Sequence, residues 1–360
     1  MPGVLDADID WTDAQQRVIQ HHEGPLQVAA CAGSGKTHTI SARIAHMVSG
    51  GISRDNIVAF TFTENAAEEL KVRVRYWMNK TGLDDPGLGD MYIDTIHAFC
   101  QHLLHEYRPE TLSYDIMGDN ERRAFIMNHF FDLGLHLMNP RHPANTYRKV
   151  EWFTEDVDTL RREMIVDDAR ASGEEATEEL MEAYDEYQRL LNRYHFFDHQ
   201  ELVYRTVQML QTDDEVRQAV RDQYQYLIVD EYQDVNFLQE RLIRLLVGED
   251  VNICVVGDDD QSIYEWRGAM PENFLAFEEE YGGEQEVLAQ NFRSTELIVD
   301  LAQGVIEQNQ DRVDKPMDTD QDYQVGDVYQ HFFDTQEEEI GFILDRIEEL
   351  VGTIYTNGEG

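Results

Sequence analysis

Four short apolar runs alternate along the chain with longer stretches of helical periodicity, a pattern typical of an α/β fold. The runs contain almost no polar residues, as expected of parallel strands that are buried on both faces. They occupy residues 26–29, 57–60, 226–229 and 253–256. Each run leads into a polar or glycine-rich segment, and open α/β sheets bind their ligands at that end of the strands. We therefore expect a functional site where these strands end.

Between the runs, apolar residues recur at the spacing of a helix. After the first run such residues predict a helix that Gly50 and Gly51 end, as glycines do at helix C-termini. From about residue 101 to 214 helical spacing replaces the strand pattern, which resumes at 226. One solvated helix there carries an apolar stripe made of Leu180, Tyr184, Tyr187 and Leu191.

These patterns predict three parts. Residues 1–100 and 215–280 would form an α/β domain with a parallel sheet, and residues 101–214 an all-helical domain inserted into it. Residues 281–360 would begin a second α/β domain, with a strand at 286–288 and a helix over 338–350. The chain reaches residue 360 before that unit is complete, so we expect an incomplete second domain.

The composition excludes several classes of protein. Hydrophobic residues make up 42% of the chain, which is too many for a disordered acidic polymer. No apolar run approaches the ~20 residues needed to cross a bilayer, and the acidic N-terminus does not resemble a signal peptide. The three cysteines are far apart and odd in number, which disfavours a disulfide framework. We expect a cytoplasmic globular protein with no membrane partner.

The charge balance is strongly acidic, with a formal net charge of −43. Acids are spread along the whole chain, and only five of the 29 basic residues are lysine. At low salt such a surface repels itself, whereas in molar salt the Debye length falls to about 3 Å and the repulsion is screened. We interpret this as adaptation to a salt-rich cytoplasm; an ordinary acidic protein is the alternative. Any DNA contact must then depend on stacking and a few local donors.

Residues 30–37, Ala-Cys-Ala-Gly-Ser-Gly-Lys-Thr, follow the first run and open a helix. They match the P-loop pattern except that Ala30 replaces the first glycine. Glycines at 33 and 35 allow backbone amides to surround phosphate, and the helix N-terminus adds partial positive charge. In such a loop Lys36 reaches the β- and γ-phosphates and the Thr37 hydroxyl binds Mg²⁺. The pattern predicts a site for a nucleoside triphosphate together with Mg²⁺.

Two further strand ends carry acids and amides. Asp230 and Glu231 follow the third run; a hard cation suits Asp230, and Glu231 suits activation of the attacking water. After the fourth run, Gln261 is placed to sense the γ-phosphate, with a plain surface-loop glutamine as the alternative. The three strand ends together predict a site for phosphoryl transfer to water.

In order along the chain, these segments resemble the motifs of UvrD/Rep/PcrA-type superfamily 1 DNA helicases. The resemblance runs from about Trp11 to Thr295, with a weaker continuation. It covers a Gln motif at 11–17, motif I at 30–37, motif Ia at 60–67, motif Ib at 93–97, motif II at 230–234, motif III at 256–269 and motif IV at 290–295. It implies two RecA-like domains that bind ATP between them, with a P-loop parallel sheet in the first.

The resemblance also implies roles for particular residues. Gln15 would hydrogen-bond the adenine, Phe292 would stack on it, and Arg293 would act as an arginine finger on the γ-phosphate. The nucleotide site would comprise Gln15, Ala30, Gly33, Ser34, Gly35, Lys36, Thr37, His38 and Phe292. Catalysis would rest on Lys36, Thr37, Asp230, Glu231, Gln261 and Arg293, with Thr37 and Asp230 as metal ligands.

The implied path for single-stranded DNA combines rings, hydroxyls and one arginine. It would comprise Phe62, Thr63, Thr95, His97, Tyr264, Trp266 and Arg267. Stacking of a base on an aromatic ring is worth about 1–3 kcal/mol and tolerates any sequence, which suits a motor. Core packing is the alternative for Phe62, Tyr264 and Trp266, and a capping or core role is the alternative for His97.

The chain departs from the family pattern in three respects. His38 stands where an arginine is common, and Glu64-Asn65 replaces a common Asn-Lys pair, so we expect weaker DNA binding at low salt. The late motifs V and VI are absent. The resemblance implies 3′-to-5′ translocation and unwinding at single-strand/duplex junctions in repair or recombination. A truncated homologue that binds ATP and DNA without unwinding is the alternative; protein partners are unknown.

Overall fold

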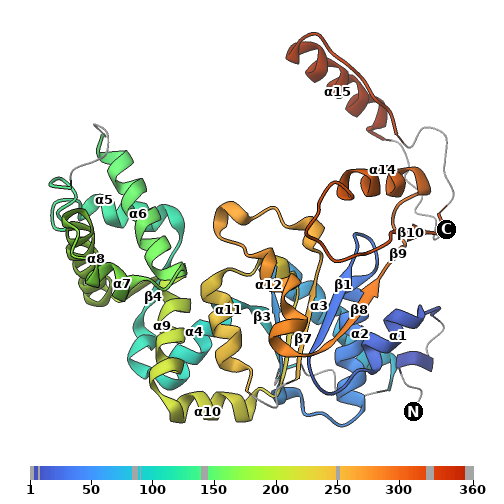
Figure 1. The fold of residues 1–360 in the computed structure, drawn as a ribbon, viewed down its shortest axis with the longest axis horizontal. Coiled ribbons are helices and arrows are strands. Elements are labelled where there is room, and N and C mark those ends of the chain that lie inside the picture. The colour runs from blue at the N-terminus through green and yellow to red at the C-terminus, as the bar shows by residue number, and fades with distance from the viewer. Residues whose placement is uncertain are drawn as a thin grey trace.

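The structure is a computed structural model that describes residues 4–6, 9–82, 88–89, 91–138, 145–248, 252–321 and 328–352. Its centre is a parallel sheet (Figure 1). The strand order is β3-β2-β6-β7-β1-β8. The strands are β1 (Leu26–Ala30), β2 (Ile57–Thr61), β3 (Tyr92–Thr95), β6 (Tyr226–Val229), β7 (Asn252–Gly257) and β8 (Glu284–Leu288). The four apolar runs are thus confirmed as β1, β2, β6 and β7. The α/β fold class is confirmed as well.

Side-chain alternation along the strands divides the core into two clusters, one on each face of the sheet. In β1, Val28 belongs to one cluster and Ala29 to the other. The Val28 face packs on α1 (Asp13–Gln20), α2 (Lys36–Ser49) and α3 (Glu64–Lys80). The Ala29 face packs on α4 (Ile96–Tyr107), α9 (His199–Thr212), α11 (Phe237–Leu246), α12 (Pro271–Leu275) and α13 (Phe277–Tyr281). Helix α2 ends before Gly50, as predicted.

The predicted helical region lies to one side of the sheet (Figure 1). Besides α9, it contains α5 (Asp119–Asn128), α6 (Thr146–Arg162), α7 (Val166–Ala171) and α8 (Glu175–Tyr194), and α10 (Asp214–Gln223) begins at its last residue. In α8, Tyr184, Tyr187 and Leu191 are buried, as the apolar stripe predicts. The region is not purely helical, because β4 (Asp115–Met117) pairs in parallel with β5 (Phe196–Asp198). Strands of three residues are too short to produce a readable alternation.

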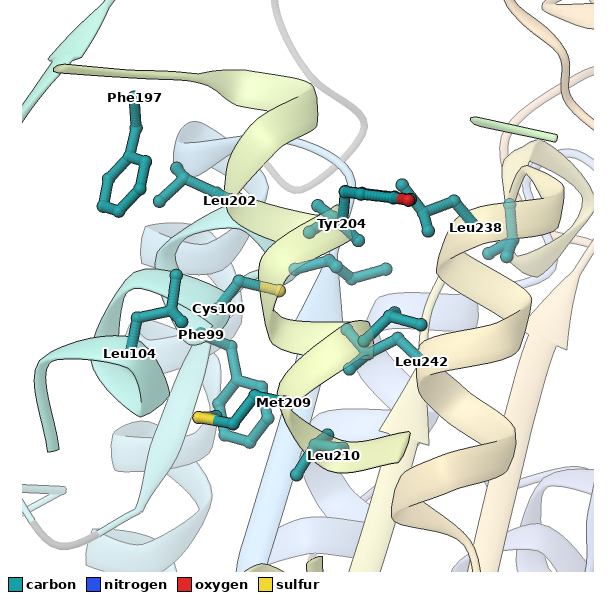
Figure 2. Packing of buried hydrophobic residues seen from close by; sticks show 14 of the residues in the cluster. Phe99, Cys100, Leu104, Phe197, Leu202, Tyr204, Met209, Leu210, Leu238 and Leu242 are labelled. Carbon is teal, nitrogen blue, oxygen red and sulfur yellow. The ribbon is translucent and has the colours of Figure 1, made fainter. Parts of the chain in front are cut away.

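Helix α9 joins the helical region to the sheet. Figure 2 shows it between α4 and α11, with Leu202 and Leu210 among the buried residues of one continuous cluster. Helix α4 itself runs from 96 to 107 and crosses the boundary expected between residues 100 and 101. A shared core of this kind favours movement of these helices together with the sheet.

The strand at 284–288 corrects one expectation. Its position in the sequence predicts the start of the second α/β domain, but it is β8 and pairs with β1 in the first sheet. Its outer position explains why its pattern differs from that of the buried runs: Glu286 forms an ion pair with Arg17, with 2.6 Å between Oε1 and Nε. Because polar residues interrupt its apolar pattern, the sequence does not indicate that this strand belongs to the first sheet.

A second α/β element follows β8 almost at once. Strand β9 (Gln290–Asn291) pairs in parallel with β10 (Asp318–Thr319), and α14 (Glu296–Ile306) lies between them in the chain. The predicted helix at 338–350 is α15 (Gln336–Leu350), which has no buried residue and projects away from the rest (Figure 1). Among the described residues, no helix combines the length and apolarity needed to cross a bilayer.

Candidate functional site

The loop between β1 and α2 needs glycine at two positions. Gly33 and Gly35 have φ values of 75° and 81°, in the left-handed region that side chains disfavour. A Cβ on Gly33 would also lie 2.8 Å from Asn291 Oδ1. Gly35 is the N-cap of α2, so the amides of Lys36 and Thr37 lie in a first turn that has no intrahelical acceptors for them. This loop presents donors to an anion.

The Lys36 ammonium lies between this loop and the end of β6. Its Nζ is 3.1 Å from Glu231 Oε2. Glu231 has φ 50° and ψ 45°, a left-handed conformation that costs a non-glycine residue about 1–3 kcal/mol and is concentrated at functional sites. Burial, together with the neighbouring Glu231 charge, raises the pKa of Asp230 to about 6, against the opposing effect of Lys36. The end of β6 therefore holds two carboxylates beside one cation.

The chemistry of these groups fits a magnesium–triphosphate unit. Carboxylate and hydroxyl oxygens, as on Asp230 and Thr37, are the ligands Mg²⁺ prefers, and amides with one lysine suit phosphate. The Ser34 hydroxyl is buried and has no hydrogen-bond partner in the described part of the chain, which leaves a donor for an incoming oxygen. Ala30 is the last residue of β1 and is buried, so its methyl group is accommodated in the sheet.

The Gln-motif helix packs against the same loop. Gln15 is buried, and its Nε2 donates to the Ser34 carbonyl oxygen over 3.2 Å. His38 stacks on Trp11, with 4.9 Å between ring centroids, and meets Trp77 edge-on. Burial, with the charges of Arg73 and Lys80, lowers the pKa of His38. The imidazole is therefore part of an aromatic cluster, which sequence reasoning did not predict.

Motif IV contacts the glycine loop through one backbone amide and through the side chain of Asn291. The Phe292 amide donates to the Gly33 carbonyl over 2.9 Å, and Asn291 Nδ2 donates to Ala32 over 2.8 Å. Asn291 Oδ1 also accepts from the amide of Arg293 over 2.7 Å. The Phe292 ring is 46% exposed, and the Arg293 guanidinium forms no hydrogen bond or ion pair within the described residues. The Phe292 ring, predicted to stack on adenine, and the Arg293 guanidinium, predicted to act as the arginine finger, are thus free to contact a nucleotide beside the loop.

A cavity of about 250 Å³ adjoins the other side of the two carboxylates. Its lining includes Phe62, Thr95, His97, Tyr264, Asp230 and Glu231. Here Phe62 stacks on Tyr264, with 5.5 Å between centroids. Burial and the nearby His199 lower the pKa of His97 to about 4, so this imidazole is neutral at physiological pH. The structure thus brings four residues of the predicted DNA path to the acids of motif II.

The remaining residues of the predicted path differ in their surroundings. Trp266 is 73% exposed, in a short turn (Glu265–Arg267). The hydroxyls of Thr63 and Thr95 accept from the amides of Ala66 and Ala98 and so cap α3 and α4. The backbone of Arg267 belongs to the described residues, but its side chain lies outside them. The two threonines therefore have a structural role besides any contact with DNA.

Gln233 has a role at this site that the sequence did not reveal. Its Nε2 donates to Glu231 Oε2 over 3.0 Å, and its Oε1 accepts from the Asp258 amide over 3.0 Å. The side chain of Gln261 in turn donates to Asp258, so it points along the loop. A buried glutamine between two strand ends links motif II to motif III; its place inside motif II was the only available signal.

Comparisons with known proteins agree with this geometry. The family model of the UvrD/REP helicase N-terminal domain matches residues 11–282. The ATP-dependent DNA helicase PcrA of Leuconostoc citreum is 34% identical over 342 residues, which cover 93% of this chain and 44% of the relative. UvrD1 of Mycobacterium tuberculosis is 34% identical over 97% of this chain and 46% of its own length. PcrA of Bacillus subtilis is 31% identical over 94% and 45%. The chain spans less than half the length of these relatives.

Proposed function

Because the chain belongs to the UvrD/REP helicase family, we propose that it supplies the ATP-hydrolysing part of a DNA motor. The relatives are named ATP-dependent DNA helicases, but they are more than twice as long as the matched region. Translocation and unwinding are therefore proposed for the whole motor, and ATP hydrolysis for the site described above.

In this proposal the residues of the glycine loop bind the triphosphate. Lys36 and the first amides of α2 neutralise the β- and γ-phosphates, while Thr37 and Asp230 hold Mg²⁺, which supplies charge neutralisation on the phosphate oxygens. Glu231 orients and deprotonates the attacking water. Arg293 stabilises charge that develops on the γ-phosphate, and Gln261 senses that phosphate. Gln15 and Phe292 contact the adenine.

Single-stranded DNA would bind over the cavity of about 250 Å³. The single observation that carries the proposal is that this cavity is lined both by Glu231 and by Phe62 and Tyr264. A change in the charge around Glu231 would then alter the position of the Phe62 and Tyr264 rings, on which the bases would stack. Thr63, Thr95, His97, Trp266 and Arg267 complete the proposed path, with 3′-to-5′ movement at single-strand/duplex junctions, in the cytoplasm, during repair or recombination.

Residues 1–100 and 215–288, which include β8, would form the first α/β unit. Residues 101–214 would accompany that unit, and the second would begin at β9. A second candidate function is binding of ATP and DNA without unwinding. The described part of the second sheet consists of β9 and β10, with two residues each.

One experiment separates the two candidates. ATP hydrolysis is measured in a KCl series with and without oligo(dT), next to strand displacement on duplexes that carry a 3′ or a 5′ single-stranded tail. Hydrolysis stimulated by oligo(dT), with displacement only from the 3′ tail, is the expected result for a motor. Stimulated hydrolysis without displacement supports the second candidate. Absence of hydrolysis and of nucleotide binding at every salt concentration would refute both.

A further inference from the structure

A buried lysine lies among three consecutive acids of motif III. The Lys315 side chain is 1% exposed, and its Nζ is 3.2 Å from Asp258 Oδ1 and 3.0 Å from Asp260 Oδ2. It also donates to Asp259. Arg312 holds Asp260 with two nitrogens, and Nη2 lies 2.7 Å from Oδ2. Neither cation lies within a recognised motif, since both follow motif IV in the chain.

The three carboxylates are arranged to surround a cation. One oxygen from each lies within 4.8 Å of the others, a spacing that suits a metal ion. Here the ammonium of Lys315 occupies that position and Arg312 adds a second charge. Burial disfavours the charged lysine, but its hydrogen bonds and the field of the acids outweigh burial and raise the pKa of Lys315. Removing one partner would leave buried charge uncompensated. The cluster therefore acts as a joint that holds the segment 258–260 to the segment 312–315.

The joint connects two moving parts of the proposed motor. Asp258 accepts from Gln261, and its amide is held by Gln233, which also binds Glu231. On the other side, Lys315 precedes β10 by three residues, and β10 pairs with β9, which leads directly to Arg293. A displacement of the β9–β10 element therefore moves Arg293 and Lys315 together.

We propose that Lys315 and Arg312 are positioning residues that set the orientation of Gln261 from the second α/β unit. The inference rests on the proposed function, since it concerns the same nucleotide site. When the second unit moves against the glycine loop, the two cations draw the 258–261 loop with it. Gln261 then meets the γ-phosphate only in the arrangement that also presents Arg293. The ion cluster thereby ties the phosphate sensor to the arginine finger.

Hydrogen–deuterium exchange with Mg²⁺ and the slowly hydrolysed analogue ATPγS tests this inference. In the unaltered chain we expect slower exchange both in the glycine loop (31–38) and in the segment 258–268. Lys315→Met keeps the length of the side chain and removes its charge. In this variant we expect full protection of 31–38 and loss of protection in 258–268. The DNA-stimulated kcat should fall about tenfold while KM for ATP changes by less than about threefold.

Two further variants make the outcome decisive. Lys315→Arg keeps the charge and should restore most of the protection at 258–268, which a purely structural role would not require. If Lys315→Met fails to fold, Arg312→Gln replaces it in the same measurement, because that side chain is 15% exposed and lies at the rim of the cluster. Unchanged protection of 258–268 in a folded neutral variant would overturn the inference alone. Absence of protection at 31–38 in the unaltered chain would overturn the proposed function and the inference together.

Discussion

Replacement of Lys36 by methionine tests the centre of the proposed site. Its Nζ lies 3.1 Å from Glu231 Oε2, and the lysine side chain is only 14% exposed. At an effective dielectric constant of about 20, two unit charges at this distance attract by about 5 kcal/mol before desolvation is counted. The ammonium therefore has one anionic partner at the end of β6, and in the proposed complex it faces the β- and γ-phosphates.

Loss of one charged donor to a developing oxyanion costs about 3 kcal/mol, or about two orders of magnitude in kcat. Lys36→Met should therefore lower ATP hydrolysis about a hundredfold, measured as kcat and KM in molar KCl with oligo(dT). Methionine is similar in length, so the fold should survive, which circular dichroism checks. Lys80→Met is the matched control, because Lys80 ends α3 at an exposed position over the rings of Tyr76 and Trp77. A folded Lys36→Met protein that keeps a third or more of kcat would show that the site assignment is wrong.

Four further predictions follow from the same geometry. Trp266→Ala should weaken binding of single-stranded DNA by about 1–3 kcal/mol in fluorescence anisotropy, with KM for ATP unchanged; an unaltered affinity would remove Trp266 from the path. Gly33→Ala should abolish nucleotide binding measured by calorimetry, since its Cβ would lie 2.8 Å from Asn291 Oδ1. Gly82→Ala is the control, because Gly82 has φ 75° and no atom within 4 Å of the added Cβ. This control should bind nucleotide and lose only about 1–2 kcal/mol of unfolding free energy to the left-handed conformation. The native pKa of His97 is lowered to about 4, so the unfolded chain binds more protons and the free energy of unfolding falls as pH decreases from about 6.5 to 4. His97→Gln should reduce this loss by up to about 3 kcal/mol in urea titrations. An equal dependence of unfolding free energy on pH in the variant and the unaltered chain would contradict the prediction. The free energy of unfolding should rise with KCl, because a net charge of −43 is screened; a flat or falling dependence would refute adaptation to salt.

The parts of the fold that could be predicted from sequence are those whose signal is local. Buried parallel strands are continuous apolar runs, and a glycine loop before a helix is read from adjacent residues, so β1, β2, β6, β7 and the loop at 30–37 were recognisable. Strand β8 was recognised as a strand but placed in the wrong sheet. Its partner, β1, lies far away in the sequence, and its polar edge face lacks the pattern of a buried run.

The rest of the site depends on contacts between distant segments. Lys315 and Asp259 are 56 residues apart, and no spacing rule connects them. Gln233 is 25 residues from Asp258, and only the fold shows that one amide group meets both motif II and motif III. A single available signal pointed to Lys315: in a chain with five lysines, one of them follows the motifs. His38 was expected beside the nucleotide, but its stacking on Trp11 depends on how α1 packs against α2.

The passage from the first sheet to the second consists of one residue. Strand β8 ends at Leu288, β9 begins at Gln290, and the Ala289 carbonyl between them accepts both from Cys31 Sγ over 3.2 Å and from the Asp318 amide over 3.1 Å. A single residue spans at most about 3.6 Å and cannot lengthen further. The first sheet and the β9–β10 sheet can therefore rotate relative to each other about Ala289, but they cannot separate at this residue. In the proposed motor, the movement between the two sheets would therefore be a rotation, with its largest displacement at the points farthest from Ala289.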